Sequence, residues 1–340
     1  MSVLTFGEIM MRLQPTDYQR FTQTNSYKCY YGGGEANVAV SLANFGEDVK
    51  FLTKLPLNSL GDACLRALKE HNVNVDHVIR GGERLGLYFS EKGASQRASK
   101  IIYDRKNSAI NSIDIKEIEM DALFDSVKHF HFTGITPALS NNTLTVLEVL
   151  LKEAKDRGVP ISCDLNYRNS LWDRQKAEKT MTKLIRYCDI LVSNEEECYK
   201  VFGLQATSTN IANGTVNLDG YVDIAKEIQM KFSNLKLIAF TLRKSISASI
   251  NRWSSIIFSG GTSFYSKEYE INVEDRIGSG DAYCAGLIYS LLKGMSKSEA
   301  VEFATAASCL KHTIEGDFNE VSVHEIFALV AGDGSGRVQR

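Results

Sequence analysis

The residues with the clearest chemical potential are Gly278, Ser279, Gly280 and Asp281, which stand together before the apolar stretch "AYCAGLIYSLL". Glycine lacks a Cβ atom, so its backbone can approach a ligand closely. The first N–H groups of a helix have no partner inside it, and the helix macrodipole adds positive potential there. The segment therefore predicts an anion site suited to a phosphate at the start of a helix.

Asp281 allows two interpretations. A carboxylate at a helix N-terminus stabilises the helix as a cap, and for an isolated G-S-G-D segment we prefer this interpretation. Asp281 could also be a general base that takes a proton from an attacking hydroxyl beside the phosphate. The rest of the sequence has to decide between these two roles.

Two better-known nucleotide motifs are missing from the sequence. No GxxxxGK[ST] phosphate loop occurs in the chain. The segment "GGGEAN" at residues 32–37 lacks the GxGxxG spacing and does not directly follow the first predicted strand. An NAD-dependent enzyme on a dinucleotide-binding sheet is therefore disfavoured.

The composition is that of an ordinary globular protein. The 340 residues are 44% hydrophobic and 24% charged, with a net charge of −2. Without a long basic block we expect neither nucleic acid nor a membrane surface as a partner. No apolar run approaches the roughly 20 residues of a membrane helix, and no signal peptide is evident. We expect a cytoplasmic protein whose seven scattered cysteines are reduced and mostly buried, without zinc.

Six short apolar runs predict buried strands that alternate with helical patterns. They span residues 3–9, 49–55, 127–135, 160–166, 189–194 and 235–242. A helical pattern covers residues 141–158, and another opens with Ser296 and Glu299 in capping-box spacing. This alternation predicts an α/β fold with a mostly parallel central sheet covered on both faces.

A second, smaller sheet is predicted from segments without helices. Residues 84–91 and 98–106 form two strand patterns joined by a polar loop, and residues 9–14 and 26–32 are also strand-like. Together they predict a small antiparallel lid on the main body. We expect one domain over residues 1–330 and a disordered Gly-rich tail at 331–340.

The catalytic interpretation of Asp281 gains support from a family resemblance. Asp275, the G-S-G-D segment and Gly286 together resemble the C-terminal signature of the ribokinase-like (PfkB) sugar kinases. The resemblance implies a three-layer α/β/α sandwich with a β lid and a kinase that uses ATP and Mg²⁺. It also implies that Asp281 is the catalytic base and that the amides of residues 278–280 hold the transferred phosphate.

A second segment, "YGGGEANVAVSLANFG" at residues 31–46, resembles the N-terminal signature of the same family. There the glycine turn and the asparagine contact sugar hydroxyls, which implies substrate contacts for Gly32, Gly33, Gly34, Glu35 and Asn37. From the residues alone, the glycines form a flexible turn before a helix over residues 36–45. Asn37 could then serve only its own turn.

The segment "NEEE" at residues 194–197 ends a predicted strand. It resembles the family element N-x-x-E, in which Asn194 and Glu197 organise Mg²⁺ and phosphate indirectly. Taken alone, the same run indicates no more than a solvated helix start.

Arg168 in "DLNYRNSLW" (residues 164–172) bears on the substrate. It follows a buried strand, where α/β proteins build their sites, and its planar fork suits a carboxylate. The segment resembles the branch of the family that acts on 2-keto-3-deoxygluconate (KDG), in which this arginine holds the substrate carboxylate and Asn166 lies toward the nucleotide. The alternative is a structural arginine paired with an acid such as Asp164.

The lid segment "YDRKNSA" at residues 103–109 resembles the same branch. The resemblance implies that Tyr103 and Arg105, with Tyr88 on the preceding lid strand, contact the sugar acid. The alternative is an ordinary sheet face that carries an exposed arginine.

The sequence departs from the family pattern at one place. Many members have K-L-G-x-x-G after the strand that precedes the nucleotide site, whereas "TLRKSISAS" at residues 241–249 has no glycine. Thr241 and Arg243 are expected to meet ATP, although a solvated basic turn is an equal alternative.

The resemblance implies an ATP-dependent kinase for the C6 hydroxyl of KDG. Three alternatives remain open: a fructokinase-like PfkB enzyme, a kinase for the C4 epimer of KDG, and a catalytically silent protein that binds a sugar acid. The family also implies a homo-oligomer and leaves room for an activating monovalent cation.

Overall fold

The computed structural model describes residues 1–205 and 218–332, so the tail expected at 331–340 lies outside the described residues from position 333 onward. A nine-stranded sheet forms the centre, in the order β14-β13-β12-β11-β10-β9-β1-β4 with β15 paired to β13. Its parallel strands are β4 (Asp48–Leu52), β1 (Ser2–Phe6), β9 (Val127–Thr133), β10 (Ile161–Asp164), β11 (Ile190–Ser193) and β12 (Leu237–Ser245). The six predicted strands are confirmed, with ends that move by a few residues.

Three further strands of the central sheet were not predicted. β13 (Ile250–Ser259) folds back antiparallel on β12, and β14 (Thr262–Tyr265) and β15 (Tyr269–Asn272) pair with β13. The turn before β13 contains neither glycine nor proline. Instead the hydroxyl of Ser247 accepts hydrogen bonds from the N–H groups of Ser249 and Ile250, at 3.1 and 3.0 Å. The stretch that lacks the family's glycine turn is therefore a hairpin.

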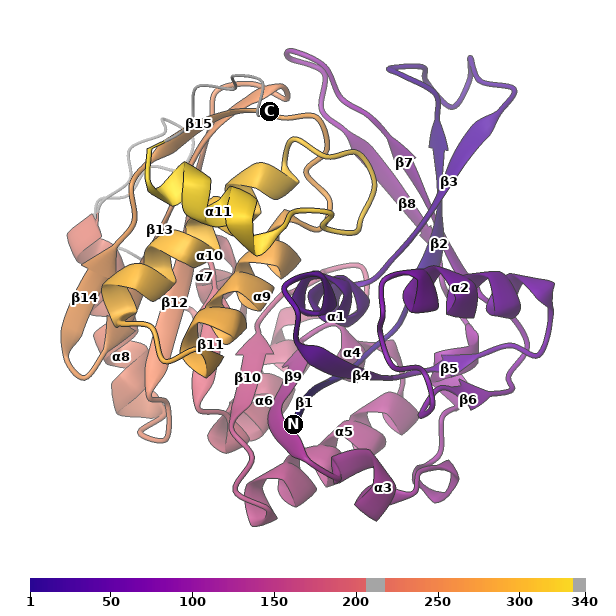
Figure 1. Cartoon of the computed structure of the whole chain (residues 1–340), viewed down its shortest axis with the longest axis horizontal. Helices are drawn as coiled ribbons and strands as arrows, with labels where there is room; N and C mark the ends of the chain where they lie inside the picture. Colours follow the sequence, from indigo (N-terminus) through magenta and orange to yellow (C-terminus); the bar gives the residue numbers. More distant parts are fainter. Residues whose placement is uncertain (206–217, 333–340) are drawn as a thin grey trace.

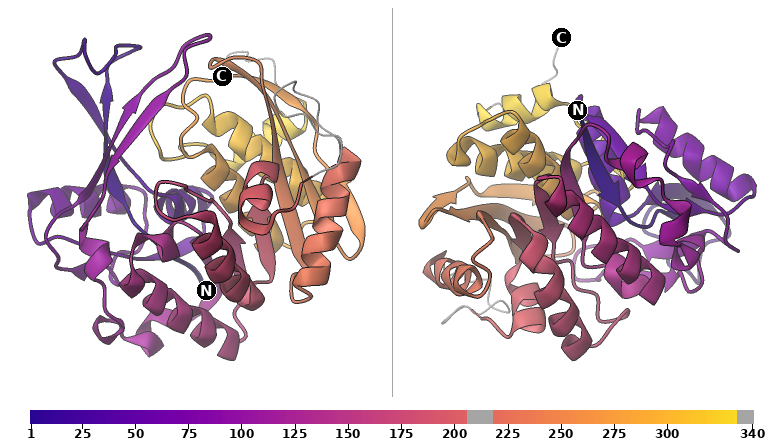
Figure 2. Two further views of the ribbon diagram at one scale, coloured as in Figure 1. Left: turned by 180° about the vertical axis from the view of Figure 1, so that it is seen from behind. Right: turned by 90° about the horizontal axis from the view of Figure 1, so that it is seen from below.

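Helices cover both faces of the sheet, as predicted (Figures 1 and 2). Two separate apolar cores lie between the sheet and the two helical layers. One layer consists of α1 (Gly34–Asn44), α2 (Ser59–Glu70), α9 (Ser279–Leu292), α10 (Lys297–Lys311) and α11 (Val323–Val330). The other consists of α3 (Met120–Phe124), α4 (Thr136–Leu139), α5 (Asn141–Asp156), α6 (Arg174–Leu184), α7 (Glu195–Phe202) and α8 (Leu218–Lys231).

The predicted lid is a separate four-stranded sheet that projects from the body, in the order β3-β2-β7-β8 (Figure 1). Its strands are β2 (Met10–Pro15), β3 (Tyr27–Gly32), β7 (Gly86–Glu91) and β8 (Lys100–Asp104). The hairpin pairs β2–β3 and β7–β8 are antiparallel, as expected, while the central pair β2–β7 is parallel. A two-stranded sheet of β5 (Lys54–Leu55) and β6 (Ile79–Arg80) lies apart from it.

The far end of the lid contacts the hairpin between β12 and β13. The N–H of Ala248 donates to the carbonyl of Ser95 at 2.7 Å, and the N–H of Ser95 donates to the Ser249 hydroxyl at 3.1 Å. These bonds hold the lid against the body.

The parallel sheet explains how distant polar residues meet. Parallel strands all end at one edge, and the chain must leave each strand there through a loop. Asp164 ends β10, Asn194 follows β11 and Thr241 lies in β12. The lid and the N-terminus of α9 face the same edge.

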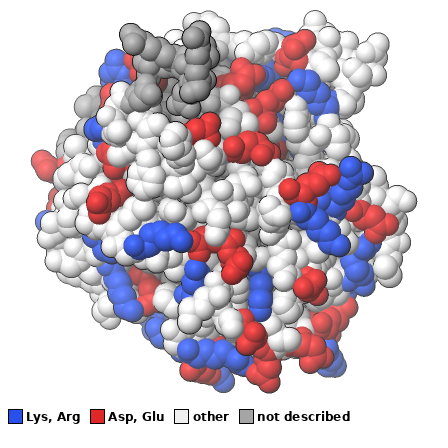
Figure 3. Space-filling view, viewed as in Figure 1, with Lys and Arg blue, Asp and Glu red and all other residues white. Residues whose placement is uncertain are grey.

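The surface carries charges of both signs. On the face shown in Figure 3, lysines and arginines are interspersed with aspartates and glutamates. Among the helices of residues 1–205 and 218–332, none combines the length and the apolar character needed to cross a membrane.

Candidate functional site

A cavity of about 540 Å³ lies at the carboxyl edge of the sheet, beneath the lid. It is lined by residues of the lid, the ends of β10 and β11, β12, and the first turns of α1 and α9. Every site residue predicted from the sequence lines it, except Gly32. A Cβ atom on Gly32 would lie 2.0 Å from a carboxylate oxygen of Asp317, so this glycine makes room for a protein side chain.

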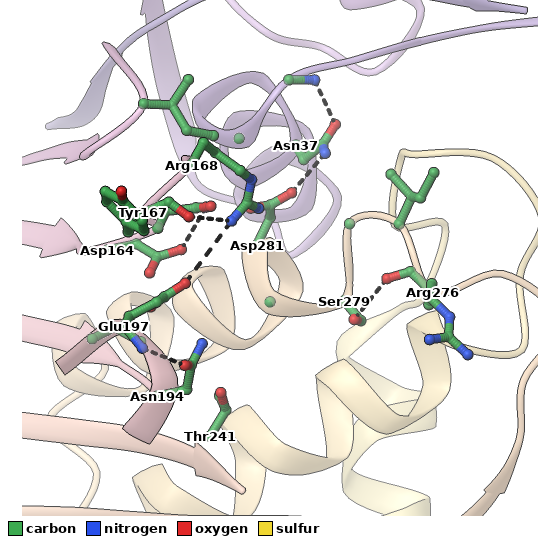
Figure 4. Close-up of a pocket in the computed structure, with 18 of the residues that line it drawn as sticks. Asn37, Asp164, Tyr167, Arg168, Asn194, Glu197, Thr241, Arg276, Ser279 and Asp281 are labelled. Carbon is green, nitrogen blue, oxygen red and sulfur yellow. Dashed lines mark hydrogen bonds and ion pairs between the residues drawn. The ribbon is translucent and has the colours of Figure 1, made fainter. Parts of the chain in front are cut away.

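The predicted anion loop begins α9 at Ser279, with Gly278 before it in the left-handed region at φ 83°. A Cβ atom on Gly278 would lie 2.2 Å from the Asp317 carbonyl oxygen, so the protein itself requires glycine here. At Gly280 a Cβ would meet nothing within 4 Å. The Ser279 hydroxyl donates to the Arg276 carbonyl at 2.8 Å and closes the turn (Figure 4).

Asp281 is buried in the first turn of α9, 9% exposed. In the described part of the chain its carboxylate has one hydrogen-bond donor, the side-chain amide of Asn37 at 2.7 Å (Figure 4). Burial raises the pKa of Asp281 to about 7; the Asn37 hydrogen bond acts in the opposite direction and the charge of Glu35 adds to the rise. The carboxylate is thus positioned to exchange a proton near neutral pH.

Asn37 serves both its own turn and Asp281. Its Oδ1 atom accepts the N–H of Gly33 at 3.3 Å, while its Nδ2 atom donates to Asp281. The contact of Asn37 with its own turn is therefore confirmed, the bond to Asp281 was not predicted, and the contact with sugar hydroxyls stays a prediction. Gly33 is also constrained by the protein, because a Cβ there would lie 1.9 Å from the Glu8 carbonyl oxygen.

Glu35 makes several hydrogen bonds within the protein. One of its carboxylate oxygens accepts the N–H and the hydroxyl of Thr133, both at 2.9 Å, and the hydroxyl of Thr136 at 2.6 Å. These bonds fix the start of α1 against the end of β9, and burial raises the Glu35 pKa. Glu35 therefore acts on the site mainly by positioning α1.

Arg168 lies among three acidic side chains. Its Nη1 atom is 4.0 Å from a Glu197 oxygen and 3.1 Å from the Tyr167 carbonyl oxygen, and the side chain is 40% exposed (Figure 4). Burial, with the charges of Glu197 and Asp281, raises the pKa of Asp164, and Arg168 partly opposes that rise. Asp164 itself is bonded to Asn166 at 3.0 Å, so the simple pair with Arg168 is not formed.

The side of the cavity near Asp164 and Glu197 is acidic, and it contains a side-chain amide oxygen that accepts no hydrogen bond from the described residues. Among residues 1–205 and 218–332, the buried Oδ1 atom of Asn166 has no hydrogen-bond partner, and the backbone of Asn166 has a φ of +37°. The Oδ1 atom of Asn194 caps α7 by accepting the N–H of Glu197 at 3.0 Å. Residues 1–205 and 218–332 contain no group of three or more His, Cys, Asp or Glu side chains that could hold a metal directly. Carboxylate and amide oxygens of this kind fit a Mg²⁺ ion that keeps several of its waters.

The lid contributes aromatic and charged side chains. Tyr103 is partly exposed, and its ring centroid is 5.8 Å from that of Tyr88. The Tyr88 hydroxyl is buried and donates to Asp317. The Arg105 guanidinium is buried and paired with Glu8, with Nε 2.8 Å from the carboxylate. Arg105 is therefore already neutralised, whereas the Arg168 side chain is 40% exposed and lies 4.0 Å from the carboxylate of Glu197.

The opposite end of the cavity is cationic. Thr241 and Arg243 line it from β12, and Arg276 lines it beside the anion loop. Burial lowers the Arg276 pKa, and the positive charge of Arg243 lowers it further. Two guanidinium groups that repel each other at a cavity wall are typical of an anion site, which suits the polyphosphate of a nucleotide.

Three functional positions were not identified from the sequence: Glu8, Arg276 and Asp317. Arg276 stands two residues before Gly278 and could have been found from that proximity. Glu8 and Asp317 are isolated acids in the sequence, and their importance arises from partners about 100 and more than 200 positions away. No local pattern marks such pairs.

Comparison with known proteins matches this geometry to one family. Residues 1–320 match the family model for pfkB family carbohydrate kinases. Over 334 residues the chain is 28% identical to a 2-dehydro-3-deoxygalactonokinase from Haloferax volcanii, covering 98% of each sequence.

Solved structures of carbohydrate kinases are also similar to this chain. The crystal structure of a 2-dehydro-3-deoxygluconokinase from Thermotoga maritima is 46% identical with a TM-score of 0.94, covering 98% of this chain and 100% of that one. A fructokinase with bound ATP from Xylella fastidiosa has a TM-score of 0.77 at 20% identity, covering 98% of both chains, which shows the fold alone. The nearly complete coverage means that the whole described architecture is shared.

Proposed function

Because this chain belongs to the pfkB family of carbohydrate kinases, we propose that it phosphorylates the C6 hydroxyl of 2-keto-3-deoxygluconate, also called 2-dehydro-3-deoxygluconate, with ATP. One observation carries the proposal: an arginine with a 40% exposed side chain, Arg168, lies in the same cavity as the buried carboxylate of Asp281. A neutral sugar has no use for this cation, whereas a sugar acid presents a carboxylate that a guanidinium binds with two parallel hydrogen bonds. The Thermotoga relative carries the corresponding name.

The substrate is oriented from its two ends. Arg168 holds the carboxylate end, with Tyr103 and Arg105 of the lid closing over it. Gly33, Gly34 and Asn37 at the start of α1 contact the hydroxyls. This orientation directs the terminal C6 hydroxyl toward Asp281, and the lid excludes water from the reacting groups.

Asp281 then acts as the base. Its carboxylate accepts the proton of the C6 hydroxyl as the C6 oxygen attacks the γ-phosphorus. The bond from that phosphorus to the β–γ bridging oxygen breaks, and ADP leaves. The amides at the start of α9 and the guanidinium groups of Arg276 and Arg243 stabilise the negative charge of the transferred group.

A magnesium ion fits the acidic side of the cavity. Asp164 and Glu197 would hold it through water, and Asn166, whose Oδ1 atom has no partner among the described residues, lines the same cavity. When bound with ATP, the ion neutralises phosphate charge. Burial raises the pKa values of Asp164, Glu197 and Asp281, and the charge of Arg168 acts in the opposite direction on all three.

Substrate choice tests the proposal directly. We expect ADP release from ATP and Mg²⁺ with KDG, and at most weak release with fructose, ribose or gluconate, measured by a coupled assay under identical conditions. Turnover on fructose or ribose would leave the base in place and overturn the role of Arg168. KDG binding without turnover on any of these substrates would favour the catalytically silent alternative.

The C4 epimer of KDG is a second candidate substrate, because a relative of nearly equal length is named for the galactonate-derived compound. Both epimers carry the same carboxylate and C6 hydroxyl, so Arg168 and Asp281 do not discriminate between them. The ratio of kcat/KM for the two epimers, measured beside the panel above, decides which one is preferred.

The ionisation of Asp281 predicts a pH profile. The base must be deprotonated, and its pKa is about 7, so kcat/KM should fall as the pH decreases below 7. Asn37 donates to the ionised carboxylate and lowers its pKa. The substitution Asn37→Ala should therefore shift the acid limb of the profile to higher pH.

A matched control uses another structural amide. Asn234 donates to the carbonyls of Ile185 and Cys188, and none of these residues lines the cavity, so Asn234→Ala should leave the midpoint of the profile unchanged. An acid limb that stays in place in Asn37→Ala would mean that the ionisation belongs to a group other than Asp281.

A further inference from the structure

Lys311 is a buried cation that the proposed reaction does not use. It is the last residue of α10, and its side chain is completely buried. Its ammonium donates to the carbonyl oxygens of Ile314 and Gly316, at 3.0 and 2.9 Å. Within residues 1–205 and 218–332, no carboxylate oxygen lies within 4.0 Å of it. Fully buried lysines usually form ion pairs, so an ammonium held by backbone carbonyls requires an explanation.

The ammonium lies directly beneath the anion loop. A Cβ atom on Gly278 would be 3.3 Å from the Cε atom of Lys311. The segment that supplies the two carbonyls is itself bonded to the start of the loop, since the N–H of Gly316 donates to Asp275 at 3.1 Å. Asp275 in turn accepts the N–H of Ile277, also at 3.1 Å. Lys311 therefore orders residues 314–317, the segment against which Gly278 packs.

The charges around residues 314–317 are nearly balanced. Arg12 of lid strand β2 pairs with Asp275 at 2.7 Å and with Asp317 at 3.0 Å, and all three side chains are buried. One guanidinium faces two carboxylates, so the group would be net negative behind a phosphate site. The ammonium of Lys311 supplies the second positive charge. Burial lowers the Lys311 pKa, while Asp275 and Asp317 raise it.

We propose that Lys311 is a tethered monovalent cation that positions the anion loop. Carbonyl oxygens directed at one point are the ligands that a free K⁺ or NH₄⁺ ion would take, and here a lysine ammonium occupies that point. Lys311 is a positioning residue, because it acts on the phosphate through Gly278 and Asp275. The inference rests on the proposed phosphoryl transfer at residues 278–281 and adds how that loop is held.

The proposal makes a prediction for the unmodified protein. Since the cation is covalently attached, kcat should be the same in buffers that contain only Na⁺ or Tris and in buffers supplemented with K⁺ or NH₄⁺. Strong, saturable activation of the wild-type protein by K⁺ would overturn the proposal, because the carbonyls would then bind a free ion. This measurement does not depend on any variant folding.

Two substitutions separate the charge from the packing. Lys311→Ala removes the ammonium and leaves space, whereas Lys311→Met removes the charge and fills the space. Both should lower kcat about 10- to 100-fold, less than the loss of a direct donor to the phosphate. Added K⁺ or NH₄⁺ should restore activity saturably in Lys311→Ala and not in Lys311→Met. Loss of kcat that no monovalent cation restores in Lys311→Ala would overturn the proposal, as would normal kcat in both variants.

Lys50 provides a matched control. Its ammonium also donates to backbone carbonyls, those of Ala122, Leu123 and Asp125 at 2.9–3.1 Å, but at the amino end of the sheet. Lys50→Met should leave kcat unchanged and insensitive to K⁺. A cation effect of equal size in this variant would assign the Lys311 result to general stabilisation.

A crystallographic readout separates failure of this inference from failure of the proposed function. Crystals of Lys311→Ala soaked in RbCl should show an anomalous peak at the Ile314 and Gly316 carbonyls, and wild-type crystals should not. This result holds even if the chain has no turnover on KDG. No peak in Lys311→Ala would overturn the tethered-cation role, whatever the substrate. Should the variants fail to fold, the wild-type measurement decides.

Discussion

Replacing Asp281 with Asn is expected to lower kcat by roughly 10²–10⁴-fold, the usual contribution of a positioned general base. The amide has nearly the same shape, and its oxygen can still accept the hydrogen bond from Asn37. The protein should therefore fold normally, and the KM for ATP should change little. Coupled measurement of ADP release gives kcat, and a thermal melt reports folding.

The same substitution tests whether Asp281 only stabilises its helix. Asp62 also lies in the first turn of a helix, α2, and is also held by one side chain, Arg80 at 2.8 Å, but lies outside the cavity. Asp62→Asn should leave kcat unchanged. Near-normal turnover in Asp281→Asn would end the base assignment and return Asp281 to the role of a cap.

Replacing Arg168 with Ala should raise the KM for the sugar acid by about 10- to 100-fold, since hydrogen bonds between charged partners each contribute about 1.5–3 kcal/mol. The KM for ATP should change far less. Arg168 also lowers the pKa of Asp281, so its removal raises that pKa and leaves less of the carboxylate ionised near neutral pH. Kinetics should therefore be measured well above pH 7, where the carboxylate is ionised in both proteins.

Two further variants sharpen the Arg168 test. Arg168→Lys keeps the charge but loses the planar fork, so its KM for the sugar acid should lie between those of the wild type and Arg168→Ala. Arg157→Ala removes an arginine that pairs with Glu153 and Asp121 on the surface and should alter neither KM. Equal shifts in both KM values for Arg168→Ala would show that Arg168 is not a carboxylate clamp.

The two substitutions test different halves of the proposal. Loss of kcat in Asp281→Asn with an unchanged KM for KDG concerns the chemical step, which any kinase of the family needs. Loss of KDG affinity in Arg168→Ala concerns the identity of the substrate. A normal Arg168→Ala variant beside an inactive Asp281→Asn variant would point to a neutral sugar as the true substrate.

The homo-oligomer implied by the family resemblance stays a prediction. Activation by a monovalent cation also stays a prediction. The contacts of Lys311 favour the alternative that the lysine ammonium itself provides the positive charge beside the anion loop.

Features that depend on neighbouring residues could be predicted from the sequence. The alternation of apolar runs with helical patterns identified the parallel sheet, because burial on two faces imposes apolar character along each strand. The G-S-G-D segment identified the start of α9, and Ser296 with Glu299 identified the capping box of α10, which the structure confirms. Each of these signals lies within a few consecutive positions, where backbone geometry and hydrogen bonding act directly.

The hairpin between β12 and β13 lacks such a local signal, although Gly260 and Gly261 do mark the turn from β13 to β14. The turn before β13 has no glycine or proline, and one serine side chain provides its hydrogen bonds. The family's glycine turn is absent at the same place, so the resemblance did not help either. Only the pairing of β12 with β13 along eight positions shows that the segment is a hairpin.

The sequence by itself determined the residue types in the cavity, and the tertiary structure decided what each of them does. Asn37 and Asp281 are separated by 244 positions and Arg105 and Glu8 by 97, and their bonds exist because parallel strands and the lid end at one edge. Arg105 is thereby neutralised and Arg168 is left exposed, a difference that no spacing reveals. Burial then raises the Asp281 pKa toward neutrality and surrounds the Lys311 ammonium with carbonyls, because desolvation depends on everything packed around a group and not on its neighbours in the chain.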